Sequence, residues 1–245
     1  MASSACILSQ PTRHRARWIS AAPIPTERGN LVAHVFQGEA CSIAADLSTE
    51  HLAWVVGDIG RGEDVPVRIH SECMTSEVFG SLKCDCKQQL DLAMDQMAKA
   101  GRGVLIYLRQ EGRGIGLGAK IQAYALQAAG MDTVEANRHQ GLPDDARVYD
   151  VVVDILDHLG VRSLRLLTNN PLKAEAMREL GLEVTGVSPV VVEPNDHSRD
   201  YLVCKRTRMA HRLPTYDGET NASHLTPFQR PRAPGRRKGP IKKLG

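Results

Sequence analysis

Three of the six cysteines in this chain lie in one stretch, SECMTSEVFGSLKCDCKQQL (residues 71–90). Cys73, Cys84 and Cys86 follow a C-x10-C-x-C pattern. Disulfides are disfavoured, because the sequence shows no export signal and cytosolic thiols stay reduced. A single cysteine is usually a buried apolar thiol, but charged residues alternate with Cys84 and Cys86. The pattern therefore favours a metal site, and zinc is the natural metal for a cytosolic thiolate cluster.

The number of ligands decides what such a metal would do. A structural zinc ion has four protein ligands, whereas a catalytic one has three and keeps a position for water. His70 precedes Cys73 by three residues and is a candidate fourth ligand, although it would serve equally to hydrogen-bond a substrate. Three states stay open: three cysteines alone, three cysteines plus His70, and no metal. An open site would lower the pKa of a bound water toward about 7 and make it a hydrolytic nucleophile.

Charge is distributed unevenly along the chain. The formal net charge is +3, but residues 226–245 contain seven basic residues and no acidic ones. The rest of the chain has 24 basic and 28 acidic residues, or −4, so the body is mildly acidic. We predict that residues 215–245 form a disordered tail rich in Pro and Gly. Such a tail allows weak, non-specific contact with a polyanion such as nucleic acid.

The N-terminal segment, residues 1–29, is predicted to be a disordered leader. Its basic residues follow its short apolar run, which is the reverse of a secretory signal. It has no acid before Glu27, so a mitochondrial or plastid transit peptide is the alternative. No window reaches the roughly 18 uninterrupted apolar residues of a membrane helix. We therefore predict a cytoplasmic protein with no membrane partner.

Between these ends, the pattern of apolar residues first indicates strands alone and then strands that alternate with helices. Strands are expected at 31–36, 51–59, 65–70, 104–108, 164–167, 184–187 and 189–194. Helices are expected at about 90–100, 119–129, 147–159 and 171–180. This order predicts an α/β (mixed α+β) fold, in which a strand-rich N-terminal portion precedes alternating strands and helices around a mixed sheet. The zinc site would lie near a strand-to-helix junction.

Two strand-to-helix turns are suited to anions. The first, EGRGIGLG (residues 111–118), lacks the ending of a Walker loop, so a tight connection is the alternative reading. It follows a buried strand, opens a helix and is accompanied by Arg109, Arg113 and Lys120. The second, TNNPLK, places Lys173 in the first turn of a helix. Backbone N–H groups at a helix start bind phosphate, as guanidinium groups do, so the two turns would suit a polyphosphate.

Several motifs recur together here: RIHSEC, the step to CDC, RQEGRGIGL, KIQAYALQ, DTVEAN, D-x-R and LLTNNPLK. In this order and spacing they resemble the GTP cyclohydrolase II family. The resemblance extends from about residue 31 to residue 213 and is densest between residues 68 and 173. The predicted leader and tail lie outside it.

The resemblance implies an enzyme that hydrolyses GTP at two places, as the first step of riboflavin biosynthesis. It would open the imidazole ring with loss of C8 as formate, and would cleave between the α and β phosphates with release of pyrophosphate. The implied product is 2,5-diamino-6-(5-phosphoribosylamino)pyrimidin-4(3H)-one. The family also implies one Zn²⁺ per chain, Mg²⁺ with GTP, and a homodimer.

The resemblance assigns roles to individual residues. The three cysteines would hold zinc, Asp145 would accept a proton, and Tyr124 would be needed for full ring opening. Arg147 matches a residue proposed to attack the α-phosphate, which is chemically awkward because the pKa of arginine exceeds about 12. Stabilising charge in the phosphoryl transition state is an equally physical role for it. The GTP-binding positions would be Arg68, Ile69, His70, Ser71, Glu72, Gln89, Glu111, Gly112, Arg113, Thr133, Thr168 and Lys173.

Some positions depart from the family pattern. Lys87 stands where glycine usually follows C-D-C, Ser76 and Glu77 stand where Gly-Asp is common, and Ala146 stands where a charge is frequent. None removes a ligand or a catalytic group. They leave open a paralogue that stops at a formamidopyrimidine or serves a secondary-metabolite pathway.

Two further hypotheses follow from the organisation of the chain. A non-enzymatic zinc module that binds nucleic acid through its tail would need a closed, four-ligand metal site. A remnant of a fusion with the enzyme that makes dihydroxybutanone phosphate would need more residues before the match than are present. We expect a monofunctional chain with one catalytic domain over residues 30–214.

Overall fold

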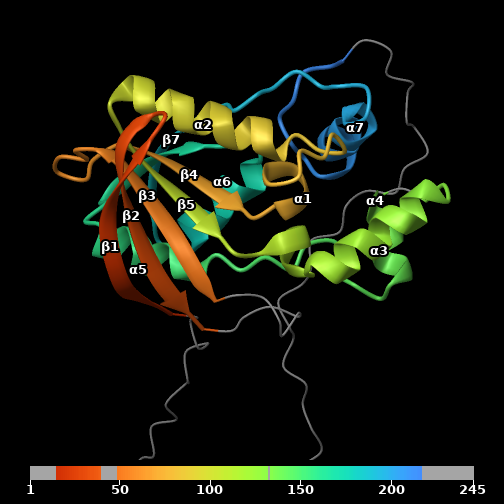
Figure 1. The fold of residues 1–245 in the computed structure, drawn as a ribbon, viewed down its shortest axis with the longest axis horizontal. Coiled ribbons are helices and arrows are strands. Elements are labelled where there is room, and N and C mark those ends of the chain that lie inside the picture. Colours follow the sequence, from red (N-terminus) through yellow and green to blue (C-terminus); the bar gives the residue numbers. More distant parts are fainter. Residues whose placement is uncertain (1–14, 40–48, 132, 217–245) are drawn as a thin grey trace, which may run out of the picture.

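A mixed sheet runs through the computed structural model, which describes residues 15–39, 49–131 and 133–216 (Figure 1). The described strands lie in the order β1-β2-β3-β5-β4-β6-β7. They are β1 (Ala16–Thr26), β2 (Gly29–Gly38), β3 (Glu50–Gly57), β4 (Val65–Ser71), β5 (Arg102–Leu108), β6 (Ser163–Leu167) and β7 (Glu183–Ser188). The helices are α1 (Met74–Glu77), α2 (Cys86–Ala100), the 3-10 turn η1 (Glu111–Gly114), α3 (Leu117–Ala128), α4 (Thr133–His139), α5 (Asp150–His158), α6 (Pro171–Glu179) and α7 (Arg199–Arg208).

The sheet has an antiparallel half and a parallel half. β1, β2, β3 and β5 pair antiparallel in that order. β5, β4, β6 and β7 pair parallel. The predicted fold class is therefore confirmed, because the N-terminal strands form the antiparallel half and the alternating strands and helices form the parallel half.

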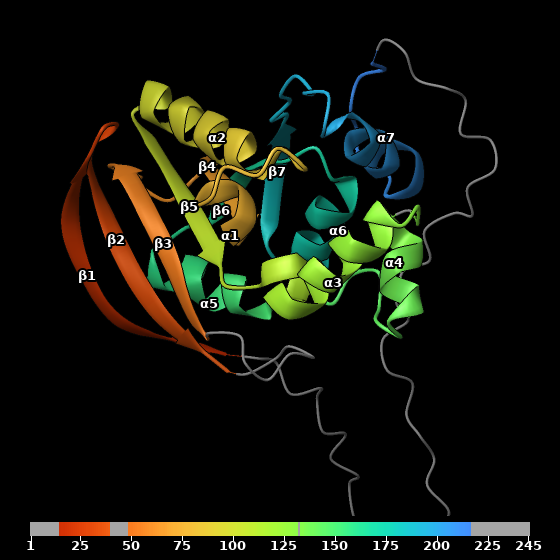
Figure 2. The ribbon, with the colours of Figure 1, turned by 45° about the vertical axis from the view of Figure 1, so that its right-hand side comes forward.

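The sheet buries one apolar cluster on each face. On one face, Val67, Ile69 and Ile106 pack with α5 and α6. On the other face, Leu105 packs with Met97 of α2 (Figure 2). Leu105 and Ile106 are consecutive in β5 and point to opposite faces, as strand geometry requires. Helices on both faces are what a parallel sheet needs to remain buried.

The parallel strands β4, β5 and β6 end at the same edge of the sheet. The register pairs Ser71, the last residue of β4, with Leu108, the last residue of β5. On the other side of β4, Val67 pairs with Leu166 of β6. The segments that follow these strands therefore meet at one edge, where open α/β sheets commonly bind ligands.

Two predicted helix ends are observed as the sequence indicates. The side chain of Asn170 accepts a hydrogen bond from the N–H of Leu172 at 3.0 Å and caps α6, with Pro171 at the first helical position. Gly101 ends α2 with a φ of 68°, a left-handed conformation that glycine adopts without a steric penalty. Both signals are local, so the sequence alone was enough to place them.

The prediction of a disordered leader is wrong for Ala16–Thr26, which forms β1. This strand pairs with β2 along its length. The ring of Trp18 stacks on His158 of α5 with 5.3 Å between centroids, and the N–H of Ala16 donates to Asp154 at 2.9 Å. β1 is an edge strand, which tolerates its two prolines. Its order comes from pairing with β2, the next strand in the sequence, and from contacts with α5, such as that of Ala16 with Asp154, 138 residues away. Composition alone shows neither.

Two other predicted elements differ from those in the structure. Residues 189–194 form no strand, because the side chain of Asn169 binds both the N–H and the C=O of Val190 and takes the place of a ladder partner. The helix predicted over residues 147–159 begins at Asp150. The sequence analysis also did not anticipate α1, α4 or α7.

The turn between β3 and β4 provides a test of close backbone packing. A β-carbon at Gly62 (φ +74°) would lie 1.9 Å from the backbone oxygen of Gly160, whereas one at Gly60 (φ +62°) would meet nothing within 4 Å. We expect Gly62→Ala to lower the free energy of unfolding by about 3 kcal/mol or more, since it combines a left-handed backbone with a clash. Gly60→Ala should lose only about 1 kcal/mol. Urea denaturation measures both variants, and equal losses would contradict the packing argument.

Candidate functional site

A cavity of about 640 Å³ opens at the carboxyl edge of β4, β5 and β6. Its walls include most of the predicted site residues: Arg68, His70, Ser71, Glu72, Cys73, Cys84, Cys86, Gln89, Glu111, Gly112, Arg113, Tyr124, Asp145, Arg147, Thr168 and Lys173. Ile69 is instead fully buried in β4, and its backbone oxygen accepts a hydrogen bond from Lys173 Nζ at 2.8 Å. Thr133 begins α4, and its side chain lies outside the described part of the chain. The fold thus brings together segments that the sequence presents separately, while their roles stay predictions.

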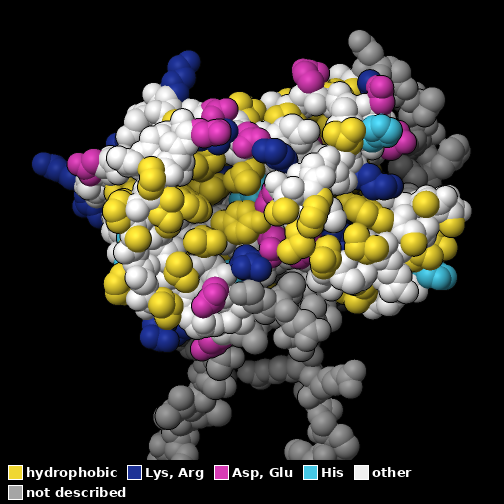
Figure 3. Space-filling model, viewed as in Figure 1, with side chains coloured by type: hydrophobic (Ala, Val, Ile, Leu, Met, Phe, Trp, Pro, Cys, Tyr) yellow, Lys and Arg dark blue, Asp and Glu magenta, His cyan; other side chains and the backbone are white. Residues whose placement is uncertain are grey.

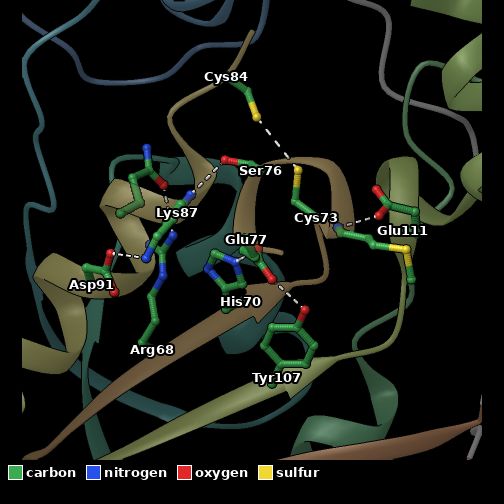
Figure 4. A network of polar contacts seen from close by, with 12 residues as sticks. Arg68, His70, Cys73, Ser76, Glu77, Cys84, Lys87, Asp91, Tyr107 and Glu111 are labelled. Carbon is green, nitrogen blue, oxygen red and sulfur yellow. Dashed lines mark hydrogen bonds and ion pairs between the residues drawn. The ribbon is translucent and has the colours of Figure 1, made fainter. Parts of the chain in front are cut away.

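The three cysteines of the metal loop (residues 72–86) converge on one point. Their Sγ atoms lie within 4.8 Å of one another, with 3.6 Å between Cys73 and Cys84 (Figure 4). Tetrahedral zinc with bonds of about 2.3 Å separates its sulfur ligands by about 3.8 Å, so this donor set fits the metal. Hydrogen bonds from Cys84 and Cys86, together with the nearby ammonium of Lys120, lower the pKa of Cys73.

His70 is bound to a carboxylate of the same loop. Its Nε2 lies 2.7 Å from Glu77 Oε1, and the other oxygen of Glu77 accepts from Tyr107 at 2.5 Å (Figure 4). Burial lowers the pKa of His70, so the neutral ring donates from Nε2. Its buried Nδ1 has no hydrogen-bond partner among the described residues. Within that part of the chain, the cysteines form a potential metal site without His70, which favours three protein ligands over four.

Two of the departures from the family pattern contact each other. The hydroxyl of Ser76 accepts a hydrogen bond from the N–H of Lys87 at 3.2 Å, which glycine at position 76 could not do. Lys87 lies in the first turn of α2 and has no positive φ, so its backbone needs no glycine. The turn beside the cysteines is therefore regular with lysine in place.

The glycine loop (residues 109–116) holds the segment that carries Asp145 and Arg147. Arg113 has a φ of +62°, an uncommon conformation for a residue with a side chain, and its backbone oxygen accepts from the N–H of Ala146 at 3.0 Å. A β-carbon at Gly114 would lie 2.9 Å from the backbone oxygen of Ala146. Close approach of the two backbones therefore requires glycine at position 114.

Two basic residues associated with the glycine loop in the sequence are paired with carboxylates. Arg109 Nε donates to Glu72 at 2.9 Å, and Lys120 Nζ donates to Glu111 at 2.8 Å. Arg113 is the basic residue of this loop that the structure leaves without such a pair among the described residues. The sequence could not distinguish these three cations, because the distinction depends on carboxylates from other segments and from the loop itself.

Three cations of the cavity form no ion pair with a carboxylate in the part of the chain that the structure describes: Arg68, Arg113 and Lys173. Neutral acceptors hold them: the backbone oxygens of Leu167 and Ile69, the amide of Gln89 and the hydroxyl of Tyr201. Burial, with the nearby charges of Arg147 and Arg68, lowers the pKa of Lys173 well below its ordinary value. Such a cluster favours a ligand with several negative charges.

Arg147 and Asp145 form a bidentate pair in the same cavity. Arg147 Nε lies 2.9 Å from Asp145 Oδ1, and Nη2 lies 2.5 Å from Oδ2. Burial opposes ionisation of both groups, but their mutual attraction prevails. It raises the pKa of Arg147 and lowers the pKa of Asp145, so the pair is a guanidinium and a carboxylate.

Helix α7 supplies wall residues that the sequence analysis did not identify. Tyr201 and Lys205 line the cavity, as does His211 just beyond the helix. Lys205 Nζ lies 2.5 Å from Oδ1 of Asp85, the residue between the second and third cysteines, and both side chains are buried. Ser198 precedes α7 and is a residue type that commonly begins a helix, so it could have indicated α7 from the sequence. The helix is mostly polar and has little apolar periodicity, so this signal had no support from its neighbours.

The ring of Tyr124 lies between two lysines. Lys83 Nζ is 5.2 Å and Lys120 Nζ is 5.8 Å from its centroid. Burial raises the pKa of Tyr124, so its hydroxyl stays protonated near neutral pH. The side chain is therefore a potential hydrogen-bond donor on the cavity wall beside the cysteines.

Comparison with known proteins gives consistent matches. A family model described as GTP cyclohydrolase II matches residues 17–189 and so includes most of β1. The chain is 48% identical over 208 residues to "Probable bifunctional riboflavin biosynthesis protein RIBA 2, chloroplastic" of Oryza sativa subsp. japonica, covering 84% of this chain and 36% of that protein. It is 50% identical over 207 residues to "Riboflavin biosynthesis protein RibBA" of Nocardia farcinica (strain IFM 10152), covering 82% and 49%. The chain therefore spans about a third to a half of the length of these relatives.

Among solved structures, one match is described as "Crystal structure of RibBX, a two domain 3,4-dihydroxy-2-butanone 4-phosphate synthase from A. baumannii.". The TM-score is 0.38 at 18% identity, over 73% of this chain and 41% of that chain. This likeness is too low to support an argument about the present chain.

The cysteine geometry predicts which residues retain a metal. We expect Cys84→Ser to reduce bound zinc from about one ion per chain to nearly none, because the two remaining thiolates are too few protein ligands to retain the ion. His70→Asn should retain the ion, and so should Cys204→Ser, which changes a cysteine away from the cavity wall. Elemental analysis after gel filtration measures the metal content. Loss of zinc from His70→Asn would contradict the three-cysteine arrangement and support a closed site.

The cluster of cations predicts pH-dependent anion binding. Because the pKa of Lys173 is lowered, its ammonium loses a proton as pH rises, and affinity for tripolyphosphate should fall with it. Lys173→Met should bind about tenfold to a hundredfold more weakly at low pH and lack this part of the pH dependence. Calorimetry at several pH values measures both effects.

The matched control for Lys173→Met is Lys87→Met, since the side chain of Lys87 is exposed on α2 and lies outside the cavity. Tripolyphosphate itself also titrates, but its titration affects every variant equally. Comparing the variants at each pH therefore cancels it. The same pH dependence in wild type and Lys173→Met would show that another group is responsible.

Proposed function

The chain belongs to the GTP cyclohydrolase II family, and from this premise we propose that it hydrolyses GTP at the described cavity. The proposed reaction opens the imidazole ring and releases formate and pyrophosphate. The proposed product is 2,5-diamino-6-(5-phosphoribosylamino)pyrimidin-4(3H)-one, so the protein would act at the first step of riboflavin biosynthesis.

The observation that supports this proposal best is the composition of one cavity. It combines a cluster of three sulfurs with Arg68, Arg113 and Lys173, cations that lack a carboxylate partner among the described residues. The two hydrolytic events of the proposed reaction need a centre that activates water and a centre that holds phosphates. One cavity of about 640 Å³ holds side chains suited to each requirement, which supports the proposal.

The three cysteines are the proposed zinc ligands. A zinc ion there would supply Lewis-acid activation of water for attack at C8 of the guanine. His70 would accept a hydrogen bond from the substrate at its buried Nδ1, since Glu77 fixes the ring through Nε2. Magnesium is proposed to enter with the triphosphate of GTP.

The paired side chains Asp145 and Arg147 are proposed to serve the phosphate end of the reaction. Asp145 stays a carboxylate and can accept a proton. Arg147 stays a guanidinium, which disfavours attack on the α-phosphate by its nitrogen and supports stabilisation of transition-state charge. Arg68, Arg113 and Lys173 would hold the phosphates in place before cleavage.

Tyr124 is proposed to act at the ring-opening centre. Its hydroxyl is protonated near neutral pH and lies on the cavity wall with the cysteines, so it can donate a proton or a hydrogen bond to a leaving nitrogen. A paralogue that stops at the formamidopyrimidine would not need this hydroxyl, so the presence of Tyr124 favours full ring opening. The alternative of a nucleic-acid-binding zinc module predicts a closed metal site, which the arrangement of His70 does not favour.

Assembly and location are also proposals. The catalytic unit would include β1 and extend to residue 214, while residues 217–245 of the basic tail lie outside the described part. A homodimer is supported by exposed apolar side chains between α1 and α2, with Val78 70% and Phe79 76% exposed (Figure 3). Across the described residues, no helix is both long and apolar enough to cross a bilayer. A cytoplasmic location and weak polyanion contact by the tail stay predictions.

Incubation of the metal-loaded protein with GTP and magnesium tests the proposal. We expect mass spectrometry to find the diaminopyrimidine monophosphate, with formate and pyrophosphate released, and with the diaminopyrimidine and formate lost after chelation of zinc. Tyr124→Phe should reduce formate release roughly a hundredfold or more and accumulate a formamidopyrimidine, because the proton donor is missing. No turnover by folded, metal-loaded protein would refute the proposed function, and formamidopyrimidine from wild type would identify the paralogue.

A further inference from the structure

Lys120 occupies an unusual place for a lysine. It lies in α3 and is buried, although lysine is almost never fully buried unless it is paired. Its Nζ is 2.8 Å from Glu111 Oε1 and 3.1 Å from Cys73 Sγ. One ammonium therefore joins a carboxylate of the glycine loop to a cysteine of the metal loop.

Glu111 holds this ammonium in a fixed position. Its Oε1 also accepts from the N–H of Gly112 at 2.8 Å, and its Oε2 accepts from the N–H of Met74 at 2.7 Å (Figure 4). Met74 follows Cys73 directly, so the carboxylate is bonded to the backbone of both loops. Lys120 has no freedom to turn away from the sulfur without breaking the ion pair.

We propose that Lys120 is a positioning residue of the metal centre, which orients Cys73 and withdraws electron density from its sulfur. The inference rests on the proposed use of the three cysteines as metal ligands. An N–H···S hydrogen bond weakens the donation of charge from a thiolate to its metal, and such outer contacts tune metal sites. The metal would thereby be more electrophilic than three unmodified thiolates would make it.

The other buried lysine beside the metal loop provides a contrast. Lys205 is bound to the side chain of Asp85 at 2.5 Å and so holds the loop between its second and third cysteines. Lys120 instead donates directly to a sulfur atom. The structure thus assigns support of the loop to one lysine and adjustment of a ligand to the other.

Three variants separate these effects. Lys120→Met combined with Glu111→Gln removes the donor without leaving an unpaired buried carboxylate, and such neutral replacement of a pair is tolerated better than loss of one partner. Glu111→Gln alone keeps the ammonium beside Cys73. Lys83→Met changes the other lysine over the Tyr124 ring; the side chain of Lys83 is exposed and, in the described part of the chain, forms no hydrogen bond with a cysteine sulfur.

Cobalt-substituted protein gives the first measurement. We expect the sulfur-to-cobalt charge-transfer band of the double variant to shift to longer wavelength, because the sulfur donates more strongly without its hydrogen bond. Lys83→Met should keep the wild-type band, and Glu111→Gln, which retains the ammonium but holds it through a weaker amide partner, should shift the band less than the double variant does. Competition with a chromophoric chelator should show roughly tenfold to hundredfold weaker zinc binding by the double variant, because loss of the contact that orients Cys73 outweighs the stronger donation of its sulfur. Urea unfolding of each variant shows whether the fold is intact.

A merely structural role would change unfolding without moving the cobalt band. The inference is overturned if the folded double variant keeps the wild-type band and binds zinc as tightly as Glu111→Gln does. This holds even if the wild-type protein turns over GTP. A shifted band in a protein that does not turn over GTP supports the inference and refutes the proposed function instead. Absence of any sulfur-to-cobalt band in wild type overturns both.

Discussion

Charged side chains held away from water at the carboxyl edge of β4, β5 and β6 determine most of the site around them. A buried charge is costly unless it is paired or hydrogen-bonded, so each one constrains its neighbours. Lys205 requires Asp85, which lies 120 residues away in the sequence. Lys120 requires Glu111, whose carboxylate also binds the N–H of Met74, 37 residues away. Lys173 is held by a neutral acceptor and has no carboxylate partner among the described residues, which favours an anionic ligand.

The metal loop is held from several sides by contacts of the protein itself. Its first cysteine follows β4, the N–H of Met74 donates to Glu111 of the glycine loop, and Asp85 is bound to α7. The sulfurs therefore already lie at a separation suitable for a tetrahedral ion. Ligands that are ordered in advance lose less conformational entropy on binding, and their outer contacts also influence the chemistry of the bound metal.

The positions that depart from the family pattern lie around this arrangement and leave its ligands in place. Ser76 bonds the backbone of Lys87, and Glu77 connects His70 with Tyr107. These contacts support the outer side of the metal loop. They explain how the loop can differ from its family at several positions while its three sulfurs still converge.

Much of the fold and site was predictable from sequence because the signals are local. Apolar periodicity, the Asn170 cap and the spacing of the cysteines predict strands, helices and a metal site directly, and the motifs identify the family. Other features, such as the order of β1, the bond of His70 to Glu77 and the two roles of buried lysines, depended on tertiary structure. They are decided by which charges and hydrogen-bonding groups meet when distant segments are buried together. The sequence by itself determined which chemical groups are available, and only the folded chain decided which of them are paired, because pairing depends on proximity and exclusion of water.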